Sequence, residues 1–251
     1  DHVGSGKDWD LSRKHGGLRI LPPFSYADKR GDGNYRGRMD ALAGVYSYLQ
    51  NIRQDYVVLA GGDLAVNLPL RDIYASHIAS GADITAVCTA TPKGAPRGCD
   101  YFTVDSKGFA SDIAVHPNEA SGCESLEVYI LTKELLLNLV DYCAAHDISS
   151  FSQGVLLTMR DRLKIHVYVH EGYAARLQSV SGYFARSMEL LDPTVRAQLF
   201  VPDRPIKTKD QSNPSTYYGP NAKSTNSLVA DGCIIEGEVE NSILFRGVRV
   251  E

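Results

Sequence analysis

The sequence predicts an α/β fold followed by a short repetitive β-structure, and three observations carry this prediction. An apolar run over 56–63 ends in two glycines and an aspartate, as expected of a strand that is buried on both faces. A helix pattern over 70–80, closed by a glycine, and a second apolar strand over 84–88 follow it. Residues 227–251 form only very short β segments separated by glycines.

A strand–helix–strand order predicts two parallel strands joined by a right-handed crossover. The remaining elements follow from apolar periodicity and turn residues, with Thr132 as the predicted N-cap of one helix. They are a helix over 39–51, a hairpin of strands 101–104 and 109–115, a strand over 126–131, a helix from 132 to 145, a helix over 151–162, a strand over 164–170 and a helix over 180–190.

The tail repeats an apolar residue every five or six positions, at Leu228, Ile234, Val239, Leu244 and Val250. This spacing is typical of a left-handed parallel β-helix, although a few ordinary hairpins would also explain it. Such solenoids need about three or more coils to bury a core. The chain supplies one or two coils, so we expect either a fragment or a tail that packs on another element.

These patterns divide the chain into an α/β domain over 1–191, a linker over 192–226 and the start of a β-helix over 227–251. The linker is inferred from four prolines and few apolar anchors between Asp192 and Tyr218.

Composition excludes several classes of protein. The chain has 251 residues, 43% of them hydrophobic, and a net charge of -4, which is enough for a large core and too acidic for a nucleic-acid surface. No apolar run approaches the ~20 residues of a membrane span, and the start of the sequence does not resemble a signal peptide. The five cysteines are odd in number and lack CxxC spacing, so we expect a reducing, cytoplasmic setting rather than disulfides or a zinc site.

Asp63 is the first candidate functional residue. It would lie at the carboxyl end of a strand, where ligands bind in open α/β sheets, and a carboxylate there can hold a divalent metal against phosphate oxygens. Alternatively it caps the next helix. His166 and His170 share one face of a predicted strand, so they are either a metal pair or solvent-facing residues.

Four segments resemble motifs of one protein family, and they occur along the chain in the same order as in that family. GGLRILPP at 16–23 is similar to an "ILPP" segment, NYRGRMDAL at 34–42 to "YRGTADAV", and VVLAGGD ending at Asp63 to "VILAGDH". The tail SLVADGCIIEGEVENSILFRGVRV is the most specific stretch. Together they resemble the ADP-glucose pyrophosphorylases (glucose-1-phosphate adenylyltransferases) of bacterial glycogen synthesis.

The resemblance implies a Rossmann-like nucleotidyltransferase domain followed by a left-handed β-helix. The implied reaction converts ATP and glucose 1-phosphate to ADP-glucose and pyrophosphate, with Mg²⁺ held by two aspartates and the sugar phosphate held by a lysine. The nucleotide-binding positions would include Gly37, Gly61 and Gly62. The family's amino-terminal glycine-rich loop is not found in the sequence, so an amino-terminal part of the domain is predicted to be missing.

The chain departs from the family at its reactive positions. Asp63 matches the first metal-binding aspartate, but Arg176 stands where a "DVGT" motif has the second. His116 replaces the lysine of "EKP", and Glu127, beside Ser125 in the degenerate sugar-phosphate site, replaces the glycine of "SMGIY". Arginine does not ligate Mg²⁺, and histidine is a shorter, mostly neutral phosphate anchor. We therefore predict a salt bridge between Asp63 and Arg176 in place of the metal.

This pattern resembles the regulatory, GlgD-type subunit of Gram-positive bacteria. The predicted partner is a catalytic ADP-glucose pyrophosphorylase subunit in a heterotetramer, with ATP, glucose 1-phosphate or a sugar-phosphate effector as ligand. An active nucleotidyltransferase that takes its second metal ligand from Asp161 or Glu171, and an oligomeric scaffold that binds no ligand, remain open alternatives.

The resemblance also implies an effector site beside the β-helix. Its candidate phosphate-binding residues are basic, and the alternative is solvated charge in a linker. They are Arg204, Lys207, Lys209 and Arg246.

Overall fold

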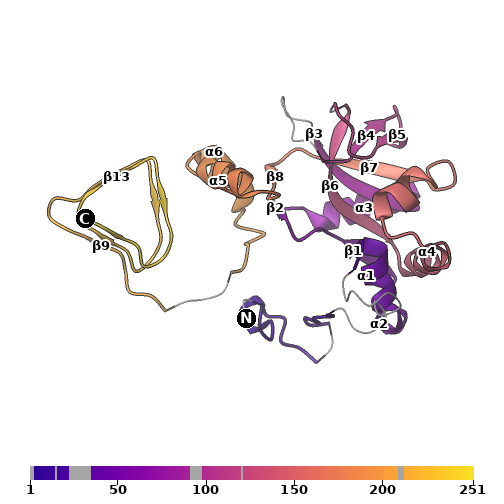
Figure 1. Cartoon of the computed structure of the whole chain (residues 1–251), viewed down its shortest axis with the longest axis horizontal. Coiled ribbons are helices and arrows are strands. Elements are labelled where there is room, and N and C mark those ends of the chain that lie inside the picture. The colour runs from indigo at the N-terminus through magenta and orange to yellow at the C-terminus, as the bar shows by residue number, and fades with distance from the viewer. Residues whose placement is uncertain (1–2, 15, 23–34, 91–97, 120, 209–211) are drawn as a thin grey trace. The chain divides into compact units, whose positions relative to one another are not determined.

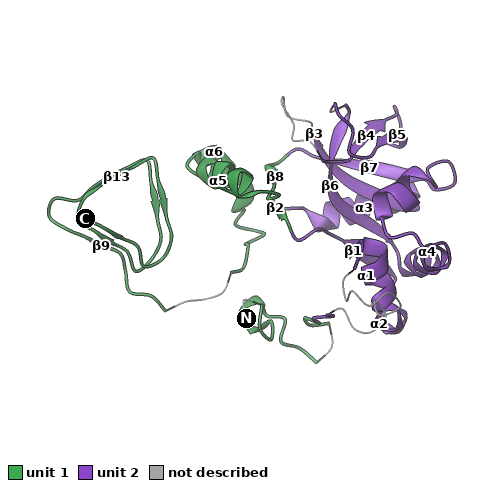
Figure 2. Ribbon diagram, viewed as in Figure 1, with its two compact units in different colours: residues 1–19, 63–67, 172–251 green, residues 20–62, 68–171 purple. Residues whose placement is uncertain are grey.

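The computed structural model describes residues 3–14, 16–22, 35–90, 98–119, 121–208 and 212–251. The chain forms two compact units, coloured separately in Figure 2. Unit 1 comprises residues 1–19, 63–67 and 172–251, and unit 2 comprises residues 20–62 and 68–171.

Unit 2 is built on a six-stranded, mostly antiparallel sheet (Figure 1). The strand order is β5-β4-β6-β3-β7, and β1 also pairs with β6. Among these pairings only β3 with β7 is parallel. The strands are β1 (Tyr56–Leu59), β3 (Ile84–Ala90), β4 (Tyr101–Val104), β5 (Ala110–Ala114), β6 (Cys123–Thr132) and β7 (Ile165–His170).

The predicted common direction of the two strands is confirmed, although they are not neighbours in the sheet. Strands β1 and β3 both run antiparallel to β6, so they point the same way, but β6 lies between them. Strand β6 is buried along most of its length, as expected of a strand that pairs on both edges. The local order of elements does not reveal that a strand from later in the sequence, β6, inserts between β1 and β3.

Helices cover both faces of this sheet. Ile84, Ala86 and Cys88 of β3 belong to the main core, together with Leu136 and Leu139 of α4 (Lys133–Ala145). The intervening Thr85 faces the opposite way, toward His77 of α3 (Leu70–Ser80). The predicted N-cap of α4 is confirmed, because the Thr132 hydroxyl accepts a hydrogen bond from the Leu135 N–H at 3.1 Å.

Two predicted helices differ from the structure. The helix over 39–51 is split into α1 (Arg38–Gly44) and α2 (Tyr46–Asn51), because Val45 leaves the helical conformation after Gly44. The helix over 151–162 is reduced to a π-helix, η3 (Ser152–Leu157), followed by turns.

Unit 1 contains η1 (Lys7–Trp9), a two-stranded antiparallel sheet of β2 (Leu64–Val66) and β8 (Ala174–Arg176), and α5 (Val180–Glu189). The linker predicted over 192–226 also contains a helix, α6 (Pro193–Leu199). The Asp192 carboxylate accepts a hydrogen bond from the Thr194 N–H at 2.7 Å, and Pro193 occupies the first turn. Proline at this position starts a helix rather than breaking it, so the segment predicted as a linker includes a short helix.

The tail forms short parallel pairs whose partners lie 15 residues apart, as Lys223 and Glu238 do, except that Tyr217 pairs with Ile234. Cys233, Ile235 and Val239 form its small core. The pairing begins at Tyr217, inside the predicted linker, rather than at residue 227. The strands are β9 (Tyr217–Tyr218), β10 (Lys223–Thr225), β11 (Leu228–Val229), β12 (Ile234–Ile235), β13 (Glu238–Glu240), β14 (Ile243–Leu244) and β15 (Arg249–Val250).

The five cysteines lie within the described residues and form no disulfide, and four of them are buried. Within the described residues, no helix combines the length and the apolar character that crossing a membrane requires.

We predict that the chain loses stability as the pH falls below about 6.5, the ordinary pKa of histidine. Burial, with a smaller contribution from His166, lowers the pKa of His77, which is 3% exposed and has Nδ1 2.8 Å from Thr85 Oγ1. Burial also lowers the pKa of His166. The unfolded chain then binds more protons than the folded chain, so the free energy of unfolding is highest above pH 6.5 and falls in acid.

Urea unfolding at a series of pH values tests this, with His77→Asn as the matched variant that keeps a polar group near Thr85. The variant should show a shallower loss of stability in acid. Identical pH profiles for the two proteins would contradict the assignment to His77.

Candidate functional site

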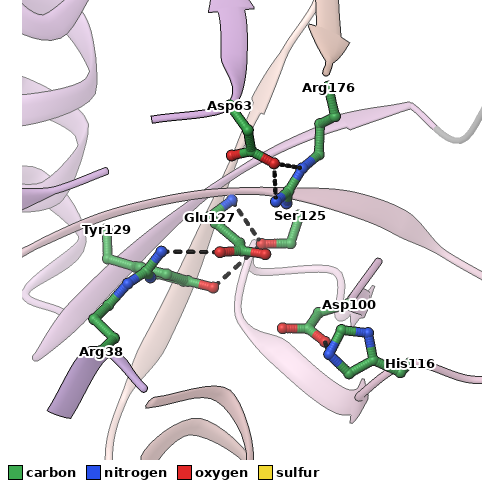
Figure 3. Close-up of polar contacts among 8 residues, drawn as sticks. All are labelled: Arg38, Asp63, Asp100, His116, Ser125, Glu127, Tyr129 and Arg176. Atoms are coloured by element: carbon green, nitrogen blue, oxygen red, sulfur yellow. Dashed lines mark hydrogen bonds and ion pairs between the residues drawn. The ribbon is translucent and has the colours of Figure 1, made fainter. Parts of the chain in front are cut away.

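An ion pair between Asp63 and Arg176 is the first candidate functional feature, and both residues belong to unit 1 (Figure 3). The pairing of β2 with β8 places Leu64 opposite Arg176, and the Leu177 N–H donates to the Asp63 carbonyl at 2.7 Å. Arg176 then donates to Asp63 Oδ2 from Nη2 at 2.8 Å and from Nε at 3.3 Å. The Arg176 side chain is 7% exposed and that of Asp63 34%.

The predicted contact between Asp63 and Arg176 is thus confirmed, although Asp63 does not end the strand that precedes it. Strand β1 stops at Leu59, and Asp63 lies immediately before β2. The two glycines, Gly61 and Gly62, interrupt the strand, since glycine is a poor strand former.

The residues at this position do not fit a divalent metal. A cation about 4 Å from the Arg176 guanidinium would be repelled by roughly 4 kcal/mol per unit of charge at an effective dielectric constant of 20. Among the described residues there is no group of three side chains that could hold a metal ion. The alternative ligand Asp161 is exposed and pairs with Arg160, and Glu171 is exposed as well. His166 and His170 likewise form no such group within the described part of the chain.

Glu127 is presented by a bulge in β6. The pairing with β3 jumps from Val87 opposite Val128 to Cys88 opposite Ser125, which leaves Glu127 outside the ladder. Its φ is +53°, a left-handed conformation that costs a residue other than glycine about 1–2 kcal/mol. The Ser125 hydroxyl accepts the Glu127 N–H at 3.0 Å and so holds the bulge. Bulges of this kind redirect a side chain beside a functional site.

Arg38 pairs with this carboxylate. Its Nη2 donates to Glu127 Oε2 at 2.9 Å, and both side chains are 23% exposed. The guanidinium carbon lies 5.6 Å from the centre of the Tyr129 ring, within cation–π range. Tyr129 is fully buried, which raises the pKa of its hydroxyl, and that hydroxyl lies 3.3 Å from Ser125 Oγ.

Sequence reasoning missed Arg38 and Tyr129 as site residues. The available signal was a paired departure: Arg38 stands at the threonine of the "YRGTADAV" motif and Glu127 at the glycine of "SMGIY". The fully buried Ser125 was predicted to bind substrate, but its hydroxyl is engaged by Glu127 and lies beside Tyr129.

His116 lies near a buried carboxylate. Its Nε2 is 3.9 Å from Asp100 Oδ1, and the Asp100 side chain is only 2% exposed. That Oδ1 has no hydrogen-bond partner among the described residues. His116 itself is half-exposed and has a φ of +47°. Its neighbour is therefore a buried carboxylate, and a histidine is a weaker anchor for a phosphate than a lysine would be.

A structural role accounts for one of the three glycines predicted to bind the nucleotide. A Cβ on Gly37 would collide with the Ser149 carbonyl, so packing explains this glycine, whereas a Cβ on Gly62 would meet open space. Gly61 and Gly62 as nucleotide-binding positions stay a prediction.

The predicted effector residues Arg204, Lys207 and Arg246 are exposed. The guanidinium of Arg204 donates from Nε to Asn67 Oδ1 at 3.0 Å. Lys209 lies outside the described residues. Phosphate binding by these residues stays a prediction.

The chain is similar over its whole length to proteins of glycogen biosynthesis. It is 33% identical to the glycogen biosynthesis protein GlgD of Bacillus subtilis (strain 168) over 251 residues, which are 100% of this chain and 62% of that protein. It is 36% identical to GlgD of Geobacillus stearothermophilus, covering 100% of this chain and 63% of the relative. Identity to the glucose-1-phosphate adenylyltransferase of Geobacillus stearothermophilus is 29%, over 99% of this chain and 65% of the enzyme.

The chain therefore spans less than two thirds of the length of these relatives. No family model matches it.

We predict that Glu127→Gly is more stable than Glu127→Ala by about 1 kcal/mol, because both lose the ion pair but only glycine relieves the left-handed strain. Urea unfolding of the two variants measures the difference. Equal stabilities would contradict the strained bulge.

Proposed function

We propose a function for this chain from the premise that it belongs to the family of the GlgD proteins and the glucose-1-phosphate adenylyltransferases. The chain is part of a regulatory subunit of ADP-glucose synthesis in glycogen biosynthesis, and it has little or no activity of its own. The observation that carries this proposal is the ion pair of Arg176 with Asp63, at 2.8 Å.

The chemistry explains why this pair matters. In nucleotidyl transfer an oxygen of glucose 1-phosphate attacks the α-phosphorus of ATP and pyrophosphate leaves, so catalysis depends on positioning and on neutralising phosphate charge. At the two positions where the family would hold Mg²⁺, this chain has one carboxylate and one guanidinium that already neutralise each other. At the sugar-phosphate positions, Glu127 adds negative charge and His116 replaces lysine. These features favour a regulatory role over a catalytic one.

The tail supports a further part of the proposal. Its parallel pairs, 15 residues apart, are consistent with the first coils of a left-handed β-helix, in which each short strand is one side of a coil. We propose that this element belongs to the assembly of a cytoplasmic heterotetramer with a catalytic subunit. A phosphorylated effector would bind beside it, through Arg204, Lys207 or Arg246.

The activity of the full-length protein tests the proposal. Alone it should form no ADP-glucose above background, and added to the catalytic subunit it should change the rate or the effector response of that subunit. Robust synthesis by the protein alone would instead favour an active adenylyltransferase, which the 29% identity to such an enzyme keeps as the alternative. An oligomeric scaffold is the outcome if ATP, glucose 1-phosphate and phosphorylated effectors all leave the Tm unchanged.

A second prediction concerns metal binding at Asp63. Arg176→Asp should create a pair of carboxylates and bind Mn²⁺, used as a probe for Mg²⁺, in the millimolar range or tighter, while the wild-type chain binds none there. Titration calorimetry measures this, and Arg176→Asn is the control that removes the positive charge without adding a carboxylate.

If the wild-type chain binds Mn²⁺ and Asp63→Asn abolishes that binding, the degenerate site is refuted. Equal Mn²⁺ affinity of Arg176→Asp and Arg176→Asn would show that a second carboxylate at position 176 does not restore metal binding.

A further inference from the structure

Arg38 and Glu127 neutralise each other although they lie far apart in the sequence. Their ion pair joins the first residue of α1 to the bulge of β6 with an N–O distance of 2.9 Å. Both side chains are 23% exposed, so replacing one of them by a neutral residue would deprive the other, partly buried charge of this ion pair. The two substitutions relative to the family motifs are therefore complementary in charge and in position.

The backbone at Glu127 indicates that this carboxylate is held there at a cost. A φ of +53° is unstrained for glycine but not for glutamate. A surface ion pair of this exposure contributes at most about 1 kcal/mol, which does not offset the strain by itself. A strained residue whose contacts do not offset its strain is better explained by a functional role than by a contribution to stability.

The guanidinium of Arg38 can bind an oxyanion. Its carbon lies over the Tyr129 ring, 5.6 Å from the ring centre, which is within cation–π range. Arginine binds carboxylates and phosphates with the same planar set of donors. Figure 3 shows the Glu127 carboxylate at the end of these donors, with its own N–H held by Ser125.

We propose that Glu127 is a built-in anion that occupies a phosphate position on Arg38 and so excludes phosphate monoesters from this site. This inference rests on the proposed function because it assumes the degenerate sugar-phosphate site. It adds that this site rejects phosphate monoesters and that Glu127 is the residue responsible. Removing the carboxylate uncovers a latent site for a phosphate monoester, with Arg38 as the specificity-determining residue.

Titration calorimetry with inorganic phosphate and with glucose 1-phosphate tests the proposal on the chain itself. Glu127→Gly removes the carboxylate and the backbone strain, and Glu127→Gln removes only the charge. We expect both variants to bind at least one of these probes about tenfold more tightly than the wild-type chain does, or to raise the Tm with it where the wild-type Tm does not change. Using both variants keeps the test valid if one of them fails to fold.

The gain must depend on Arg38. The double variants Arg38→Ala with Glu127→Gly and Arg38→Ala with Glu127→Gln should lose it, and affinity should fall with ionic strength. Unchanged affinity in both single variants, or a gain that survives Arg38→Ala, would overturn the proposal. These outcomes are separate from the proposed function, which fails if the wild-type protein alone makes ADP-glucose, whatever the affinity of the Glu127 variants.

Discussion

The ion pair of Arg176 with Asp63 is the interaction on which the functional interpretation depends. Strands β2 and β8 bring the two residues together from distant parts of the sequence, and the backbone bond from Leu177 to the Asp63 carbonyl fixes their register. Because the Arg176 side chain is 7% exposed, its guanidinium needs a fixed anionic partner rather than solvent. A metal ion bound to Asp63 would be repelled by the nearby Arg176 guanidinium. At this separation the repulsion energy exceeds the net free energy that a typical hydrogen bond contributes.

The same principle applies a second time in unit 2. There Glu127 supplies the anion and Arg38 the cation, and a strained bulge holds the carboxylate in position. In each unit a charge that could meet a ligand meets a side chain of the same protein instead. Such pairing neutralises a charge that could bind a ligand, while the surrounding strands and their core need not change.

Local signals in the sequence predicted the elements that depend on local interactions. Helix α3 with Gly81 at its end and helix α4 with Thr132 as its cap are confirmed residue by residue, because capping and periodicity act over a few positions. The insertion of β6 between β1 and β3 could not be predicted, since it depends on pairing between strands about seventy residues apart, whose register no local pattern encodes. Helix α6 was missed because a proline was read as a breaker when it starts the helix.

The candidate site shows the same division. Aligning family motifs was enough to predict that Arg176 would meet Asp63, since both occupy recognisable positions. Arg38 was not found, because a single charged residue at the start of a short helix has no periodicity, and its departure from the family motif gains meaning only when it is paired with that of Glu127.

A double-mutant cycle on Asp63→Ala and Arg176→Ala, measured by urea unfolding with and without millimolar Mg²⁺, tests the central claim most directly. If the ion pair stands in place of the metal, the coupling free energy is about 1–3 kcal/mol and Mg²⁺ leaves it unchanged. A coupling near zero, or stabilisation of the wild-type chain by Mg²⁺ that requires Asp63, would contradict the claim.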